Sequence, residues 1–323
     1  MKKSRTTIIF IFILILAFIT AIVIHLWVTE NGEGINPDSV SYIASANNIL
    51  KGNGLFTRGV SSHFPPIYPI ILTIIGFFNS NIVDSARWLH AILFATNAIL
   101  FGATIYLGTR RNLIAVVFGL LIFFSSKAVL STHSYALSES PFLMFSLIAF
   151  LLLAFFISSQ KWIFLILSAI SLGFALATRY VGIALLPPAV IVLFLFIKRP
   201  VKYKVKTVIS MVILALTPIS IWIIRNLLIT NSATNRKILF HPRSISSMGR
   251  AFVDVFHNFI LPDSGSKYFK TFELILISVI LIYMFFVLYK KQSVYNDSEW
   301  LSLSMMITQP FFCKFESEIS IVL

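Results

Sequence analysis

The sequence has few charged residues and almost no cysteine, and each shortage excludes a class of protein. Only 12% of its 323 residues are charged, whereas a soluble globular domain has about 25%. Hydrophobic residues make up 58% of the chain, and the mean hydropathy is +0.90. The single cysteine, Cys313, excludes an intramolecular disulfide framework and a cysteine-based metal cluster. The composition excludes a soluble globule and a disordered chain, so it predicts an integral membrane protein.

Long apolar runs predict an all-α, polytopic membrane helix bundle of about eight spanning helices. Crossing the hydrocarbon core of a bilayer takes about 20 residues. The first run, 8–28, follows Lys2, Lys3 and Arg5 and shows no convincing cleavage site, so it is expected to be a signal-anchor that stays on the chain. The further runs lie at about 83–107, 113–130, 140–157, 161–178, 181–197, 207–228 and 272–290.

One shorter apolar run, 64–78, is predicted not to span. It has three prolines near its start, and the charge distribution supports this interpretation. If it does not span, the inner side carries 13 basic residues and no acid up to residue 291. If it did span, Arg110, Arg111 and the basic cluster at 198–206 would face outward, against the positive-inside rule. We therefore expect 64–78 to be interfacial or re-entrant, with the N-terminus of the chain in the cytoplasm.

This topology divides the chain into a transmembrane domain, 1–291, and a short cytoplasmic or atypical tail, 292–323. It gives two long outer loops, at about 29–82 and 229–271, and short inner loops. All eight acidic residues before position 291 then lie on the outer side. Long loops tend to be functional, so we expect the site on the outer face of the membrane.

The first outer loop contains the strongest catalytic candidate, Asp38. Apolar residues recur at helical spacing over 35–50, which predicts an amphipathic helix lying on the membrane. Asp38 falls in its first turn. It is either the N-cap of that helix or a carboxylate held just above the bilayer as a general base, and the spacing leaves both open.

The segment 61–72, SSHFPPIYPIIL, offers two further candidates. Its tandem prolines force an extended and rigid entry to the membrane. The segment is either a stiff turn or a wall that positions His63 and Tyr68 near Asp38. In the second case, His63 could bind a metal or donate a hydrogen bond.

An acid and two arginines complete the candidate site. Glu139 opens a spanning helix, where it either interacts with the helix dipole or pairs with Asp38 on a metal or on the acceptor; Ser138 before it could cap the helix. Arg179 and Arg225 lie at the outer ends of apolar helices, where they either snorkel to the lipid headgroups or bind phosphate. Acids and arginines on one membrane face suit an anionic substrate.

An ordered set of motifs gives the chain a family resemblance over about residues 8–260. The motifs are PDSVSY at 37–42, HFPPIYP at 63–69, ARWLHAILF at 86–94 and LSESPF at 137–142, followed by ATRYVG and IWIIRN. In this order and sidedness they resemble the GT-C superfamily of integral-membrane glycosyltransferases. The resemblance is to the dolichyl-phosphate-mannose-protein mannosyltransferase and aminoarabinose-transferase-like families.

The resemblance implies a GT-C-like fold and an inverting sugar transfer. The donor would be a polyprenyl-phosphate-linked sugar and the acceptor a lipid, a glycan or a protein. The reaction would take place at the outer, periplasmic face of the inner (plasma) membrane, among membrane lipids, with no nucleic acid as a partner.

The resemblance also implies roles for individual residues. Asp38 would be the catalytic base, Glu139 the second acid for acceptor or metal, and Arg225, with Arg179, the ligand of the donor phosphate. Tyr42, His63 and Tyr68 are candidate substrate contacts. Some family members use a divalent metal ion. Here Ser39 follows Asp38 where many relatives have a second acid, so metal dependence stays open.

Two other functions fit parts of the same pattern. A transporter or lipid flippase would also place acids outside and arginines in the membrane, but it would usually show paired broken helices and inverted repeats, whereas this sequence shows one broken segment and no repeat. An inactive, C-terminally truncated glycosyltransferase is the third alternative, because relatives continue with further helices where this chain stops soon after Lys291.

Overall fold

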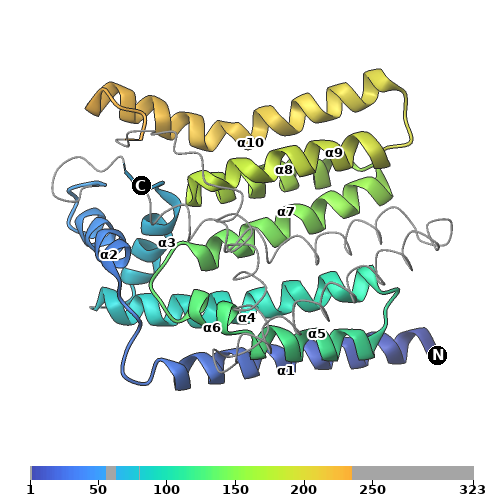
Figure 1. Ribbon diagram of the computed structural model, residues 1–323, viewed down its shortest axis with the longest axis horizontal. Coiled ribbons are helices and arrows are strands. Elements are labelled where there is room, and N and C mark those ends of the chain that lie inside the picture. The colour runs from blue at the N-terminus through green and yellow to red at the C-terminus, as the bar shows by residue number, and fades with distance from the viewer. Residues whose placement is uncertain (1, 56–62, 80, 235–323) are drawn as a thin grey trace, which may run out of the picture.

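The protein is a bundle of helices, as the sequence predicts (Figure 1). The computed structural model describes residues 2–55, 63–79 and 81–234. These residues form no strand beyond an isolated bridge between Gly34 and Tyr135. The predicted run 272–290 and the tail 292–323 lie outside the described residues. The helices are α1 (Lys2–Val28), α2 (Pro37–Leu50), α3 (Ile67–Gly76), α4 (Ile82–Gly108), α5 (Leu113–Ser125), α6 (Lys127–His133), α7 (Glu139–Ser159), α8 (Trp162–Thr178), the 3-10 helix η1 (Tyr180–Leu185), α9 (Leu186–Phe196) and α10 (Val201–Thr230).

Four of these helices, α1, α4, α7 and α10, are long and apolar enough to cross a membrane. Helices α5 and α6 add a fifth span if they are counted together. The helices α8 and η1–α9 are shorter, so the predicted total of about eight stays a prediction. Helix α3 has ten residues and rises about 15 Å, half the thickness of the hydrocarbon core, in keeping with a segment that does not span.

Two predicted spans are interrupted. The run 113–130 is two helices bent by 65°, because Ser126 has extended backbone and its hydroxyl accepts a hydrogen bond from the Val129 amide as the N-cap of α6. The run 181–197 begins as η1 and becomes α-helical at Leu186, where the next two residues are prolines. Prolines lack the amide hydrogen, which a helix can forgo only in its first turn.

The bundle has two halves that meet between α4 and α7. In one half α1, α4 and α5 pack around a core that includes Phe94, Ile105 and Leu120. In the other half α7 to α10 pack around Leu165, Leu172 and other buried side chains. The short helices α2 and α3 gather at one end of the bundle, at the left in Figure 1, and the N-terminus lies at the opposite end.

The acids of the described residues lie at one of these two ends, and several basic turns lie at the other. The turns that hold Arg110, Arg111, Lys161, Lys198 and Arg199 lie at the N-terminal end of the bundle (Figure 1). The described acids instead follow α1, lie on α2 or begin α4 and α7, at the α2–α3 end. Which of the two ends faces the cytoplasm stays a prediction.

Helix α2 is capped by Asn36. The Asn36 side chain accepts a hydrogen bond from the Ser39 amide at 2.8 Å, and the Ser39 hydroxyl accepts one from the Asn36 amide at 3.2 Å. The interpretation of Asp38 as the N-cap is therefore wrong, because Asn36 has the extended backbone that a cap requires and Pro37 is already helical. The Asp38 carboxylate is left exposed in the first turn.

Candidate functional site

Four residues from three elements meet at the α2–α3 end of the bundle. Arg179, at the end of α8, forms an ion pair with Glu139 at the start of α7. The guanidinium also donates to the Ser138 hydroxyl at 3.4 Å, and the Ser138 and Tyr42 hydroxyl groups lie 3.0 Å apart within hydrogen-bonding distance. We call Tyr42, Ser138, Glu139 and Arg179 the Glu139–Arg179 site. The expected cap role of Ser138 is not seen, because its hydroxyl makes these contacts instead of bonding to α7.

The ion pair is partly open to the surroundings. The side chain of Glu139 is 22% exposed and that of Arg179 is 11% exposed, whereas Tyr42 is buried. In the structure the guanidinium is directed to Glu139 and Ser138, whereas a snorkelling arginine would direct it to lipid headgroups.

Asp38 lies one helical turn before Tyr42 on α2. Burial raises the pKa of the Tyr42 hydroxyl, and the charge of Arg179 acts in the opposite direction. The carboxylates of Glu139 and Asp38 both add to the increase. Asp38 is therefore one helical turn away from Tyr42, the member of the Glu139–Arg179 site that α2 contributes.

Arg225 is linked to this site through an aromatic side chain. Its guanidinium lies 4.8 Å from the centre of the Trp222 ring and donates to Asn226 at 3.0 Å. The Trp222 indole donates to the hydroxyl of Tyr180, the residue that follows Arg179. Arg225 thus lies against the face of Trp222. Trp222 in turn contacts Tyr180, the neighbour of Arg179 in the sequence.

The two candidates on the proline segment differ in their surroundings. His63 is exposed and its ring packs edge-on against Phe64. Tyr68 is fully buried, with its hydroxyl 2.9 Å from Nε2 of His90 and its ring packed edge-on against Tyr42 at 4.9 Å. Direct contact of either residue with substrate stays a prediction. In the structure the buried ring of Tyr68 packs against the ring of Tyr42.

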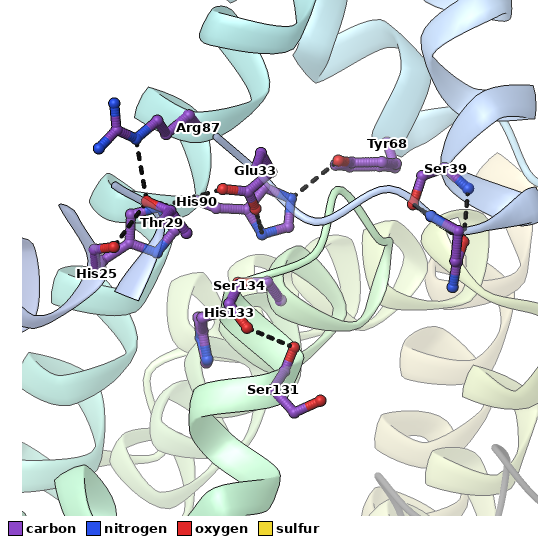
Figure 2. A network of polar contacts seen from close by, with 12 residues as sticks. His25, Thr29, Glu33, Ser39, Tyr68, Arg87, His90, Ser131, His133 and Ser134 are labelled. Carbon is purple, nitrogen blue, oxygen red and sulfur yellow. Dashed lines mark hydrogen bonds and ion pairs between the residues drawn. The ribbon is translucent and has the colours of Figure 1, made fainter. Parts of the chain in front are cut away.

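A second polar cluster, which the sequence did not reveal, is drawn in Figure 2. It adjoins the Glu139–Arg179 site through the packed rings of Tyr68 and Tyr42. Glu33 is buried between His25 of α1 and His90 of α4, and His90 contacts Tyr68. We call these four residues the histidine cluster. An ionisable residue inside an apolar run is costly to bury. His90 within ARWLHAILF is therefore a residue in the sequence that indicates a buried polar cluster here.

The buried side-chain amide of Asn97 is hydrogen-bonded to the first turn of α7. Asn97 of α4 donates to the Ser140 carbonyl at 3.1 Å and lies 2.9 Å from Nε2 of His133. Nδ1 of His133 lies 2.7 Å from the Val129 carbonyl, so Nδ1 carries the proton and Nε2 accepts from Asn97. These bonds join α4 and α6 to the residue next to Glu139.

The donor set for a metal ion is not assembled in the part of the chain that the structure describes. It contains no group of three or more His, Cys, Asp or Glu residues arranged to hold a metal ion. Glu139 pairs with Arg179, which neutralises the carboxylate that the sequence offered as a metal ligand.

Comparison with known families gives one result. Residues 68–225 match the family model of dolichyl-phosphate-mannose-protein mannosyltransferase. The resemblance predicted from the sequence is confirmed. At the level of this mannosyltransferase family, the match supports a membrane glycosyltransferase and a multi-pass membrane protein. No curated protein and no solved structure gives a significant match to the chain.

The matched segment covers part of the site. It includes Glu139, Arg179 and Arg225, together with Tyr68 and His90 of the histidine cluster. It begins after Asp38 and Tyr42 on α2. The mannosyltransferase match therefore bears on the acid–arginine pair, whereas Asp38 lies outside the match and its catalytic role stays a prediction.

Proposed function

We propose that the chain transfers a sugar from a polyprenyl-phosphate-linked donor to a hydroxyl group of a lipid, glycan or protein acceptor at the outer face of the membrane. One observation carries the proposal. The segment that matches the mannosyltransferase family contributes an acid–arginine pair, and Ser138 joins this pair to Tyr42 on the helix that presents the exposed carboxylate of Asp38.

Asp38 is the general base in this proposal. Its carboxylate takes the proton of the acceptor hydroxyl while the oxygen attacks the anomeric carbon of the sugar. The bond between that carbon and the phosphate oxygen breaks, and polyprenyl phosphate leaves with the electron pair. Attack from the side opposite the phosphate inverts the anomeric centre.

The arginines stabilise the departing phosphate. A guanidinium binds phosphate oxygens with two parallel hydrogen bonds and keeps its charge at any physiological pH. Arg225, held on the Trp222 ring, is the principal phosphate ligand in this proposal. Arg179 is fixed by Glu139 and Ser138 and supplies the second donor. No step is assigned to a metal ion.

The test is transfer by an Asp38→Asn variant in membranes that contain labelled polyprenyl-phosphate sugars and acceptor. Loss of the base should lower the transfer rate by about 10²- to 10⁴-fold, because an amide cannot take the acceptor proton. The matched control is Asp84→Asn, which makes the same change at an exposed acid in the first turn of α4.

The control should transfer sugar at the wild-type rate. Equal transfer by Asp38→Asn and wild type, at equal amounts of protein, would remove Asp38 from the mechanism. A wild-type chain that transfers no sugar from any member of the donor panel would overturn the proposed function itself.

A further inference from the structure

Glu33 is the most deeply buried acid in the described part of the chain. Its side chain is fully buried, as is that of His90, and His25 is 1% exposed. One carboxylate oxygen lies 3.3 Å from Nε2 of His25 and the other lies 3.7 Å from Nδ1 of His90. Burial raises the pKa of the Glu33 carboxyl, while His25 and Arg87 oppose the increase. Burying such a group is costly. The two histidine nitrogens nearest to the carboxylate come from different helices and lie at ion-pair distance without forming a hydrogen bond to it.

The loop that contains Glu33 is fastened at both ends. At its start, Arg87 of α4 donates to the Thr29 hydroxyl at 3.0 Å and to the Leu26 carbonyl at 2.9 Å. At its end, the Gly34 amide donates to the Ser134 carbonyl, and the Gly34 carbonyl accepts from the Ala136 amide, each at 2.9 Å. Figure 2 shows the first of these attachments, from Arg87 to Thr29, beside Glu33 and His90.

Gly34 also sets how closely the loop approaches the segment before α7. A Cβ atom at this position would lie 2.7 Å from both the Ser134 carbonyl oxygen and a ring carbon of Tyr135. The loop therefore runs against the segment that leads into Glu139, and two residues later Asn36 begins α2. The same short loop thus leads into α2, which holds Asp38, and is bonded to the segment that precedes Glu139.

A second set of contacts leads from the histidine cluster to the Glu139–Arg179 site. Nε2 of His90 meets the Tyr68 hydroxyl, and the Tyr68 ring packs against the Tyr42 ring. The Tyr42 hydroxyl meets Ser138, which accepts from Arg179. Every member of this set is buried or nearly so, and densely packed buried side chains transmit displacement rather than absorb it.

We propose that Glu33 is a positioning residue for the sugar transfer: held between His25 and His90, it fixes the first loop so that Asp38 of α2 faces the Glu139–Arg179 site. This inference rests on the proposed function. Glu33 itself is buried away from any substrate and acts through the placement of α2.

The experiment compares Glu33→Ala, Glu33→Gln and Glu30→Ala in the full chain, purified in lipid nanodiscs. Two quantities are measured: hydrogen exchange of the α2 backbone amides, and kcat and KM for a polyprenyl-phosphate sugar. Glu33→Ala removes both histidine contacts. Glu33→Gln keeps the shape of the side chain and offers the two histidines one acceptor and one donor group. Glu30→Ala removes an exposed acid three residues earlier in the same loop.

Glu33→Ala should speed exchange in α2 by about tenfold or more, because a lost buried partner weakens the attachment of the loop. It should lower kcat by about 10- to 100-fold with little change in KM, because a displaced base slows the chemical step. Glu33→Gln should recover most of both quantities, and Glu30→Ala should match wild type. If Glu33→Ala does not fold, His25→Asn, which removes one of the two contacts, should show the same effects at smaller size.

Unchanged α2 exchange in Glu33→Ala would overturn the inference whatever the chain catalyses. Faster exchange spread evenly over α2, α7 and α10 would also overturn it, since it would show a general loss of stability. The exchange measurement needs no catalytic turnover, so an inactive wild-type chain would contradict the proposed function and leave the attachment of α2 testable by itself.

Discussion

The contacts of Arg179 distinguish between the two roles that the sequence allows for it. As a lone arginine at the end of an apolar helix, it fits lipid contact and phosphate binding equally well. The structure directs it to Glu139 and Ser138, on a different helix. A paired guanidinium is held in one place, which suits a residue that must meet a phosphate in a fixed geometry.

The pair should be energetically coupled. In a double-mutant cycle of Glu139→Ala and Arg179→Ala, the two effects on unfolding free energy should fall short of additivity by roughly 0.5–3 kcal/mol. The reason is that either substitution alone removes the whole interaction. Thermal or denaturant unfolding of the detergent-solubilised protein measures this.

A matched cycle combines Arg179→Ala with Lys198→Ala. Lys198 lies at the opposite end of the bundle, so these two effects should add within experimental error (Figure 1). Additivity in the Glu139–Arg179 cycle as well would contradict the observed pair.

At the scale of elements, the close approach of α8 and α10 holds Arg179 and Arg225 on neighbouring helices. Gly173 permits that approach. A Cβ atom there would lie 2.9 Å from the Ala215 carbonyl oxygen and 3.0 Å from Cγ of Pro218. Pro218 sits inside α10, where its ring replaces an amide hydrogen and faces this glycine.

Gly173→Val should therefore destabilise the protein by about 1–3 kcal/mol, because the added side chain meets backbone and a rigid ring that cannot move aside. The midpoint of thermal unfolding in detergent measures the loss. Leu167→Val is the control, since it also puts a β-branched residue on α8 at an exposed position. A Gly173→Val variant as stable as the control would show that the two helices can separate without cost.

At the scale of the whole molecule, the distribution of charge predicts how the bundle lies in the membrane. Basic turns gather at the N-terminal end and the described acids at the α2–α3 end (Figure 1). The positive-inside rule then predicts that the Glu139–Arg179 site lies on the outer side.

Single-cysteine labelling tests this orientation. In a Cys313→Ser background, Asn53→Cys in the loop after α2 should react with a membrane-impermeant maleimide in intact cells. Lys198→Cys, in the turn before α10, should react only after the membrane is permeabilised. Both positions are exposed in the structure, so accessibility from each side of the membrane decides the result. The reverse pattern would invert the proposed topology.

The sequence by itself determined the fold class and the resemblance to the mannosyltransferase family. Apolar runs of about 20 residues leave a chain little choice but to form helices in a membrane, and the basic residues between them are local in sequence. For the same reason Asp38, Glu139, Arg179 and Arg225 could be named as candidates, because each interrupts or borders an apolar run.

Only the tertiary structure decided which of these residues meet. The pairing of Glu139 with Arg179 joins residues 40 positions apart, and Tyr42 reaches Ser138 across 96. Glu33 looked like one acid among several in a loop, and only packing of α1 against α4 encloses it between two histidines. Local spacing predicts elements, but burial and partners come from contacts between elements, which no local pattern encodes.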